Sequence, residues 1–202
     1  MKFGKKGFTL IELLAVIVIL GVLISIAVPK VTKYITNSRK ESYISEMLTF
    51  IGTVKDDITS EVYPAPIKNS DAVVITFDIA NLDKSQNKSP FGGKYIPSKT
   101  YVVVVNVGSG SDPEYKYYVA SQDTKDYAIP LTSESNLNKN KIIANAKNKM
   151  EVTVQSICGT SDGYNREYTE ISGLTDIQPV DENGNKISWN VTIYSSEACN
   201  GQ

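Results

Sequence analysis

Apolar residues are concentrated in one segment near the N-terminus. From Phe8 to Val28 the chain reads FTLIELLAVIVILGVLISIAV, and Glu12 is the only charged residue in it. A helix of this length extends roughly 31 Å, close to the hydrocarbon thickness of a bilayer. The pattern therefore predicts a helix that is apolar all round and long enough to cross a membrane.

Past Pro29 the helical pattern continues with one apolar face. Apolar residues recur at spacings of one, three or four: Ile44, Met47, Leu48, Ile51, Val54 and Ile58. Two prolines, Pro64 and Pro66, then stop the helix. We expect a helical rod of roughly 80 Å from Phe8 to about Val62.

The remainder of the chain alternates apolar and polar residues with a period of two, which is typical of strands. Strands are predicted at 73–79, 101–107, 115–120, 152–157, 168–171 and 187–194. The run YVVVVNV at 101–107 is apolar on both faces, which indicates a central strand. The fold class is therefore α+β, a long N-terminal helix packed on an antiparallel sheet.

Composition argues against an enzyme. The 202 residues carry a net charge of −1 and contain no histidine, which removes histidine-based triads and histidine-ligated zinc. No cofactor is expected. The lysines between 139 and 149 fit a solvated face better than a nucleic-acid surface, because aromatic residues are not interleaved with them. Asp181–Asn185 fits a hairpin turn better than a calcium loop, which needs a closing glutamate.

Three interpretations of the N-terminal segment compete. Basic residues precede it at Lys2, Lys5 and Lys6, and small residues near Ala27 offer a site for signal-peptide cleavage. The segment also suits an uncleaved membrane anchor. The third interpretation rests on the boundary itself, where Lys5-Lys6-Gly7 is followed by Phe8-Thr9-Leu10-Ile11-Glu12-Leu13-Leu14.

That string resembles the class III signal of type IV pilins and of their relatives, the pseudopilins of type II secretion and competence systems. The resemblance implies cleavage after Gly7 and N-methylation of Phe8, with the apolar segment retained. It also implies that Glu12 pairs with the new amine of a neighbouring subunit and sets the register of assembly. The alternative is a glutamate that reaches the headgroups. A carboxylate inside a membrane needs either such a partner or contact with the headgroups, because nothing else in the apolar span neutralises it.

The resemblance extends to two further features. Between Gly21 and Pro29 it implies a hinge or local loss of helix, although a simple kink fits the residues equally well. Cys158 and Cys199 would close a loop of about 40 residues, which resembles the C-terminal disulfide loop of many pilins. Two reduced thiols are the alternative.

The resulting hypothesis is a pilus subunit. It divides the chain into a cleaved leader (1–7), a transmembrane and filament-core helix (8–29), an amphipathic helix (30–63) and a sheet domain (64–202). The subunit would occupy the cytoplasmic membrane as a single-pass protein and then a cell-surface pilus for adhesion, motility or DNA uptake. The implied partners are other pilin subunits, the prepilin peptidase and methylase, the assembly ATPase and the platform protein. The alternatives are a pseudopilin and a membrane-anchored binding domain that never polymerises.

Overall fold

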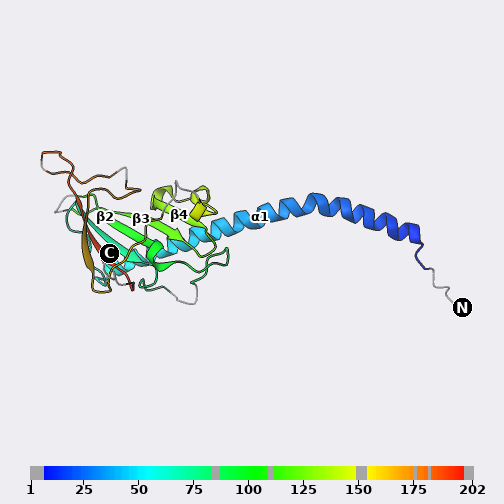
Figure 1. Cartoon of the computed structure of the whole chain (residues 1–202), viewed down its shortest axis with the longest axis horizontal. Coiled ribbons are helices and arrows are strands. Elements are labelled where there is room, and N and C mark those ends of the chain that lie inside the picture. The colour runs from blue at the N-terminus through cyan, green and yellow to red at the C-terminus, as the bar shows by residue number, and fades with distance from the viewer. Residues whose placement is uncertain are drawn as a thin grey trace. The chain divides into compact units, whose positions relative to one another are not determined.

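The computed structural model describes residues 7–82, 87–108, 112–148, 154–174, 177–181 and 183–197. The chain forms two compact units, Met1–Arg39 and Lys40–Gln202, and each is considered by itself. One helix, α1, runs from Leu10 to Thr59 and contributes to both (Figure 1). The sequence predicts four segments that differ in processing and in membrane burial. The division into two compact units does not test these properties, so the four segments stay a prediction.

The helix α1 ends earlier than the sequence predicts, before the two prolines that follow it. The amide of Glu61 donates to the carbonyl of Ile58 at 3.2 Å, and the amide of Val62 donates to the carbonyl of Asp57 at 2.9 Å. Glu61 has a φ of 58°, in the left-handed region. These two bonds are those of a Schellman cap, which satisfies the last carbonyls and turns the chain out of the helix. The cap, rather than a proline, ends α1.

From Lys40 onward α1 buries one side. The residues buried there are Tyr43, Ile44, Met47, Phe50, Ile51, Val54, Asp57 and Ile58. The predicted stripe is wrong only at Leu48, whose side chain remains 42% exposed. Tyr43 and Phe50 are buried as well, on the side away from Leu48, so the centre of the buried side lies near Val54 and Met47. At 100° per residue Leu48 is roughly 110° from that centre, so its side chain points away from the sheet.

Six strands form one sheet in the order β4-β3-β2-β1-β6-β5. Their bounds are β1 Asp71–Thr76, β2 Tyr101–Asn106, β3 Tyr115–Gln122, β4 Ala128–Ser133, β5 Tyr164–Tyr168 and β6 Trp189–Tyr194. Neighbouring strands are antiparallel except β1 and β6, which are parallel with Ala72 opposite Val191. The α+β fold with a mostly antiparallel sheet is confirmed, and a wholly antiparallel sheet is wrong at this one pair.

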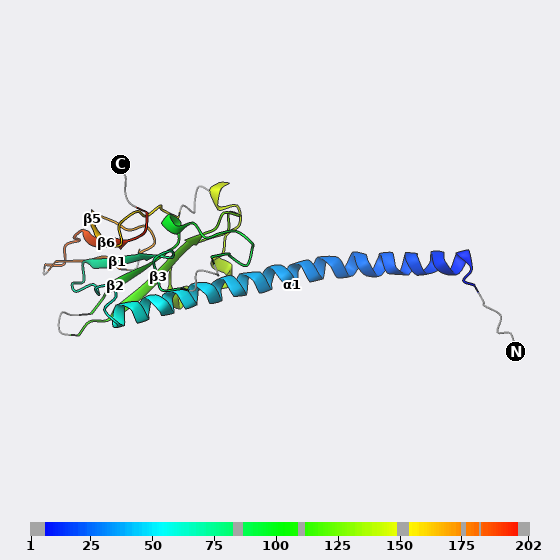
Figure 2. The same cartoon turned by 90° about the horizontal axis from the view of Figure 1, so that it is seen from below.

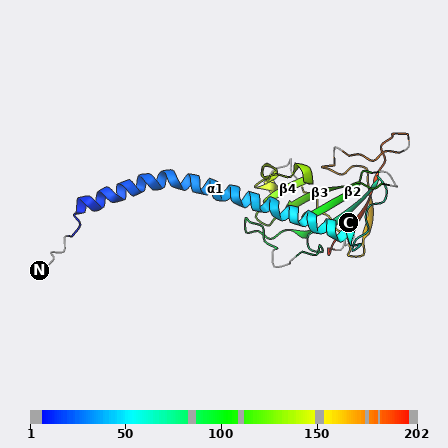
Figure 3. The ribbon, with the colours of Figure 1, turned by 180° about the vertical axis from the view of Figure 1, so that it is seen from behind.

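Both faces of the sheet are covered. Val73 and Val104 belong to the core beneath α1, whereas Val74 and Val103 belong to a second core on the opposite face. The cyan end of α1 lies along the first face (Figures 2 and 3). The segments that flank β5 contribute Val154 and other apolar residues to the second core. Every residue of β2 is buried, which confirms its central position in the sheet.

The strand predictions hold best where apolar residues run longest. Strands β1, β2, β3 and β6 lie within two or three residues of their predicted positions. The fifth strand is 164–168 rather than 168–171, and 154–157 forms no strand, while residues 152 and 153 lie outside the described residues. Strand β4 is not predicted, because Pro130 interrupts its pattern. Proline is tolerated there because β4 is an edge strand, where one amide need not enter the ladder.

The connection between β1 and β2 is held against α1 by polar and aromatic contacts. The hydroxyl of Tyr95 donates to Oε2 of Glu46 at 2.5 Å. The rings of Phe91 and Tyr127 stack with their centroids 3.6 Å apart. Burial raises the pKa of Glu46 above its ordinary value, and the hydrogen bond from Tyr95 opposes this shift. The connection therefore belongs to the packed part of the domain.

The contrast between Ile51 and Leu48 gives a direct test of the packing on α1. Ile51→Ala should lower the free energy of unfolding by about 2–5 kcal/mol, because it leaves a cavity in the core. Leu48→Ala should lower it by less than about 1 kcal/mol, because that side chain stays partly in solvent. Urea unfolding of the full chain in detergent, followed by tryptophan fluorescence, measures both. Equal losses for the two variants would contradict the observed face.

Candidate functional site

The N-terminal residues that carry the sequence motif are open to solvent. Residues 7–9 form no regular structure, and α1 begins at Leu10. A Cβ added to Gly7 would meet no atom within 4 Å, and Phe8 is 89% exposed. The peptide bond between Gly7 and Phe8 therefore lies in an uncovered stretch without regular structure, which makes it accessible to a peptidase. The predicted basic leader residues Lys2, Lys5 and Lys6 lie outside the described residues.

Glu12 has a partner within its own chain. Its Oε2 accepts a hydrogen bond from the backbone amide of Thr9 at 2.8 Å and another from the Thr9 hydroxyl at 2.9 Å. The amide of Glu12 in turn lies 3.3 Å from Thr9 Oγ1. This reciprocal arrangement is a capping box, in which the first helical turn satisfies its own orphan donors. These hydrogen bonds stabilise the Glu12 carboxylate without neutralising its charge, so the pairing of Glu12 with the amine of a neighbouring subunit stays a prediction.

The sequence contains the signal for this arrangement. The pattern Thr-x-x-Glu immediately before an apolar helical run is the signature of a capping box, and Thr9 to Glu12 fits it. Thr9 is thus a site residue that reasoning from the charge of Glu12 alone misses. A carboxylate at this position also lies at the positive end of the helix dipole, which favours its ionised form.

The capping box leaves half of the carboxylate available. Both donors from Thr9 reach Oε2, and no donor to Oε1 is found in the part of the chain that the structure describes. A carboxylate has two oxygens and accepts several hydrogen bonds. Glu12 can therefore hold the helix start with one oxygen and accept a cation from another molecule with the other.

The apolar segment of α1 is uncovered. Every residue from 7 to 39 is exposed, and the large apolar side chains from Leu10 to Ile35 keep between 45% and 84% of their surface in solvent. Within the described residues, α1 is the one helix that is long and apolar enough to cross a membrane. A monomer in water does not expose apolar surface of this extent without cost, so lipid or other protein must cover it. The first part of α1 fits membrane anchoring.

The predicted hinge residues lie within regular helix. Gly21 and Pro29 are both helical, and the Ser25 hydroxyl donates to the carbonyl of Val22 at 2.7 Å. Ser25 also supplies the carbonyl that Pro29, lacking an N–H, cannot bond. The hinge concerns the assembled state, so it stays a prediction.

The cysteine pairing also stays a prediction, because Cys199 lies outside the described residues. The structure nevertheless brings the neighbours of both cysteines together. The amide of Gly159 donates to the carbonyl of Glu197 at 2.9 Å. The residue after Cys158 is thus bonded to a residue two positions before Cys199.

The arrangement of the described residues also bears on metal binding. They contain no group of three His, Cys, Asp or Glu side chains placed to hold a metal ion. At the predicted hairpin, Asp181 accepts the amides of Asn183 and Asn185, and Val180 pairs with Lys186 across the turn. The oxygens of Asp181 therefore serve the turn itself.

Comparison with known proteins supports the N-terminal motif. Residues 2–28 match the model of the prokaryotic N-terminal methylation motif. The chain is similar to a type IV major fimbrial protein FimA of Dichelobacter nodosus, with 33% identity over 101 residues, 50% of this chain and 61% of the relative. A fimbrial protein of the same organism gives the same identity and coverage. Another FimA of that organism is 48% identical over 46 residues, 23% of this chain and 30% of the relative.

No solved structure matches the chain. The chain spans 61% of the length of the first of these relatives. The resemblance to type IV pilins that rests on Gly7, Phe8 and Glu12 is confirmed by both the motif and the relatives.

The capping box predicts a specific effect of Thr9. Thr9→Val removes the hydroxyl that bonds Glu12, and losing an N-cap costs about 0.5–2 kcal/mol. Amide exchange in the first turn of α1, measured by NMR on the full chain in micelles, should accelerate roughly 2- to 30-fold for this variant. Thr9→Ser keeps the hydroxyl and should exchange as the wild type does. Unchanged exchange in Thr9→Val would show that Thr9 does not cap the helix.

Proposed function

We propose that this chain is the structural subunit of a type IV pilus. It is inserted in the cytoplasmic membrane, cleaved after Gly7, N-methylated on Phe8 and polymerised through α1 into a surface filament for adhesion, motility or DNA uptake. The observation that carries the proposal is the uncovered apolar segment that begins with the motif at Gly7, Phe8 and Glu12.

Cleavage would create the charge that completes the site. A cut after Gly7 leaves an amine on Phe8, four residues before Glu12. A charge inside a membrane costs about 2.5–3.5 kcal/mol on insertion scales, and an amine and a carboxylate that pair reduce this cost for each other. The free Oε1 of Glu12 is the acceptor available to the amine of a neighbouring subunit. Such a pair fixes how far one helix is displaced along the next.

Apolar contact would supply cohesion once the register is set. The side chains from Leu10 to Ile35 are exposed on every side of the helix, so the segment contacts lipid before assembly and several neighbouring helices afterwards. Gly21 and Pro29 are the positions at which the helix would bend or open to fit the filament. The partners are other pilin subunits, a prepilin peptidase and methylase, an assembly ATPase and a platform protein.

The exported domain would be closed by a disulfide. The hydrogen bond between Gly159 and Glu197 supports a bond between Cys158 and Cys199, because it holds the two chain segments together. The disulfide would link the C-terminal segment covalently to the segment before β5.

The mature N-terminus tests the proposal. Mass spectrometry of protein purified from its own cells should find N-methylated Phe8 as the first residue. Gly7→Leu should keep the leader and abolish sheared surface filaments, whereas Gly4→Leu, which changes the other leader glycine, should be processed normally. A mature chain that begins at Val28, or at Met1 in the wild type, contradicts the proposal. Correct processing without surface filaments would indicate a pseudopilin.

The role of Glu12 in assembly has a separate test. Glu12→Ala removes the acceptor for the neighbour's amine, so sheared filaments should fall at least about tenfold while the processed subunit still accumulates in the membrane. Glu61→Gln changes an exposed glutamate on the turn after α1 and should leave filament yield unchanged. Wild-type yield from Glu12→Ala would overturn the assigned role.

A further inference from the structure

The edge strand β5 presents an aromatic and cationic strip that the filament does not require. Tyr164, Arg166 and Tyr168 alternate along the strand and therefore share one face. Their partners across the ladder are Ile193, Val191 and Trp189, which belong to the second core. β5 is the last strand of the sheet, so this strip lies at an open edge.

Within the described ranges, Arg166 contacts tyrosines rather than a carboxylate. Its guanidinium carbon lies 5.7 Å from the ring centroid of Tyr164. The hydroxyls of Tyr168 and Tyr164 lie close enough to raise the pKa of Arg166. No carboxylate lies within 4 Å of this side chain among the residues that the structure describes. The guanidinium thus lies over one aromatic ring and near two tyrosine hydroxyls, and its planar set of donors suits a carboxylate.

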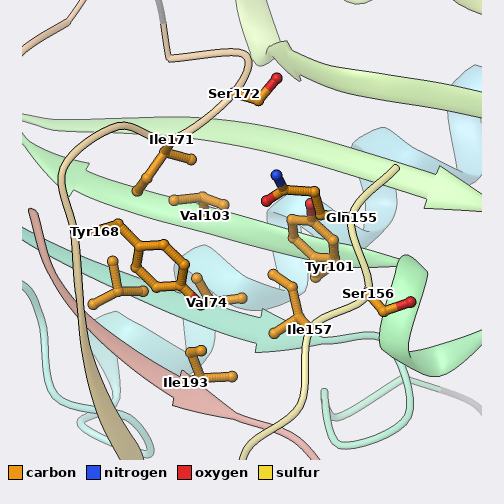
Figure 4. A pocket seen from close by; sticks show the side chains of 11 residues that line it. Val74, Tyr101, Val103, Gln155, Ser156, Ile157, Tyr168, Ile171, Ser172 and Ile193 are labelled. Carbon is orange, nitrogen blue, oxygen red and sulfur yellow. The ribbon is translucent and has the colours of Figure 1, made fainter. Parts of the chain in front are cut away.

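A pocket opens beside this strip on the same face of the sheet. It has a volume of about 40 Å³, and its floor is formed by apolar residues of the sheet, including Val74, Val103 and Ile193. Figure 4 shows the Gln155 amide and the Tyr168 ring on opposite sides, with Val74 and Val103 between them. The volume admits a group of a few heavy atoms rather than a long chain.

The remaining walls of the pocket combine apolar Ile157 and Ile171 with polar, uncharged side chains. Gln155, Ser156 and Ser172 contribute amide and hydroxyl groups, and none of the lining residues is charged. Burial raises the pKa of Tyr101 at the base of the pocket, so its hydroxyl stays neutral. The pocket therefore suits a small neutral substituent that forms hydrogen bonds and also has an apolar part.

The strip and the pocket form one continuous surface. Tyr168 belongs to both, and Arg166 precedes it by two residues on the same side of β5. Two residues of a strand span roughly 6–7 Å, which is about the width of one sugar ring. A single ligand of that size can contact the guanidinium with one end and enter the pocket with the other.

We propose that this surface binds a carboxylate-bearing sugar. The carboxylate pairs with Arg166, the apolar face of the ring lies against the tyrosine rings, and a small neutral substituent such as an acetamido group enters the pocket. An aliphatic acid fits less well, because the cavity is short and its polar walls would lose hydrogen bonds. This proposal depends on the proposed function in one respect only, namely that the sheet domain faces the exterior of the cell.

The binding test uses the full chain in detergent micelles, so it does not depend on filament formation. The probe is the methyl glycoside of N-acetylneuraminic acid, and the readout is the fluorescence of Trp189, the only tryptophan, which lies opposite Tyr168. Binding should be saturable, and the methyl ester of the probe, which lacks the charge, should bind at least tenfold more weakly.

Matched arginine variants then locate the site. Arg166→Gln should weaken binding of the acid at least tenfold and leave binding of the ester unchanged. Arg39→Gln alters the only other arginine and should have no effect. Glucuronic acid, which lacks the acetamido group, should bind more weakly than the probe. Absence of saturable binding, equal binding of acid and ester, or an Arg166→Gln variant that binds as the wild type does would each overturn the proposal.

Discussion

The structure depends on one constraint: the single helix α1 must be stable in two different environments along its length. Up to Ile35 its large side chains are exposed on every side, which is stable only in contact with lipid or other helices. From Lys40 onward it buries one side against a sheet and leaves the other in water. The boundary between the two compact units falls between these regions. The globular unit is thereby joined to a segment that has no cover of its own, and lipid or other protein must supply that cover.

The Glu12 carboxylate accepts hydrogen bonds within its own chain and keeps one oxygen available for a donor from another molecule. Before assembly, the amide and hydroxyl of Thr9 compensate Glu12 through Oε2, so the carboxylate is not left bare in an apolar environment. A second donor at Oε1 adds to this arrangement without replacing it. An amine from a neighbour would therefore meet an acceptor whose position the capping box has already fixed. Preorganisation of this kind lowers the entropy lost when two subunits pair.

The sequence predicts what depends on long, regular patterns. The apolar segment, the amphipathic half of α1 and the central strand β2 all follow from periodicity, and the N-terminal methylation motif is a contiguous stretch of sequence. Features decided by tertiary contacts do not follow. Leu48 fits the helical period yet lies outside the buried side, because Tyr43 and Phe50 extend that side in the opposite direction around the helix. Glu61 ends α1 in a conformation usually taken by glycine, which residue type alone does not reveal. The capping box, in contrast, is predicted by the pattern Thr-x-x-Glu from Thr9 to Glu12. Reasoning from the charge of Glu12 alone does not reveal it.

The order of the strands links the fold to the proposed sugar site. Strands β4 and β5 lie at opposite edges of the sheet, so the chain between them must cross it, and a second long segment joins β5 to β6. These two segments cover the face of the sheet opposite α1, supply the second core and form the walls of the pocket. The face against α1 is fixed by packing and the N-terminal segment by assembly. The segments around β5 pack their apolar residues into the second core, whereas Gln155, Ser156 and Ser172 line the pocket and are available for recognition.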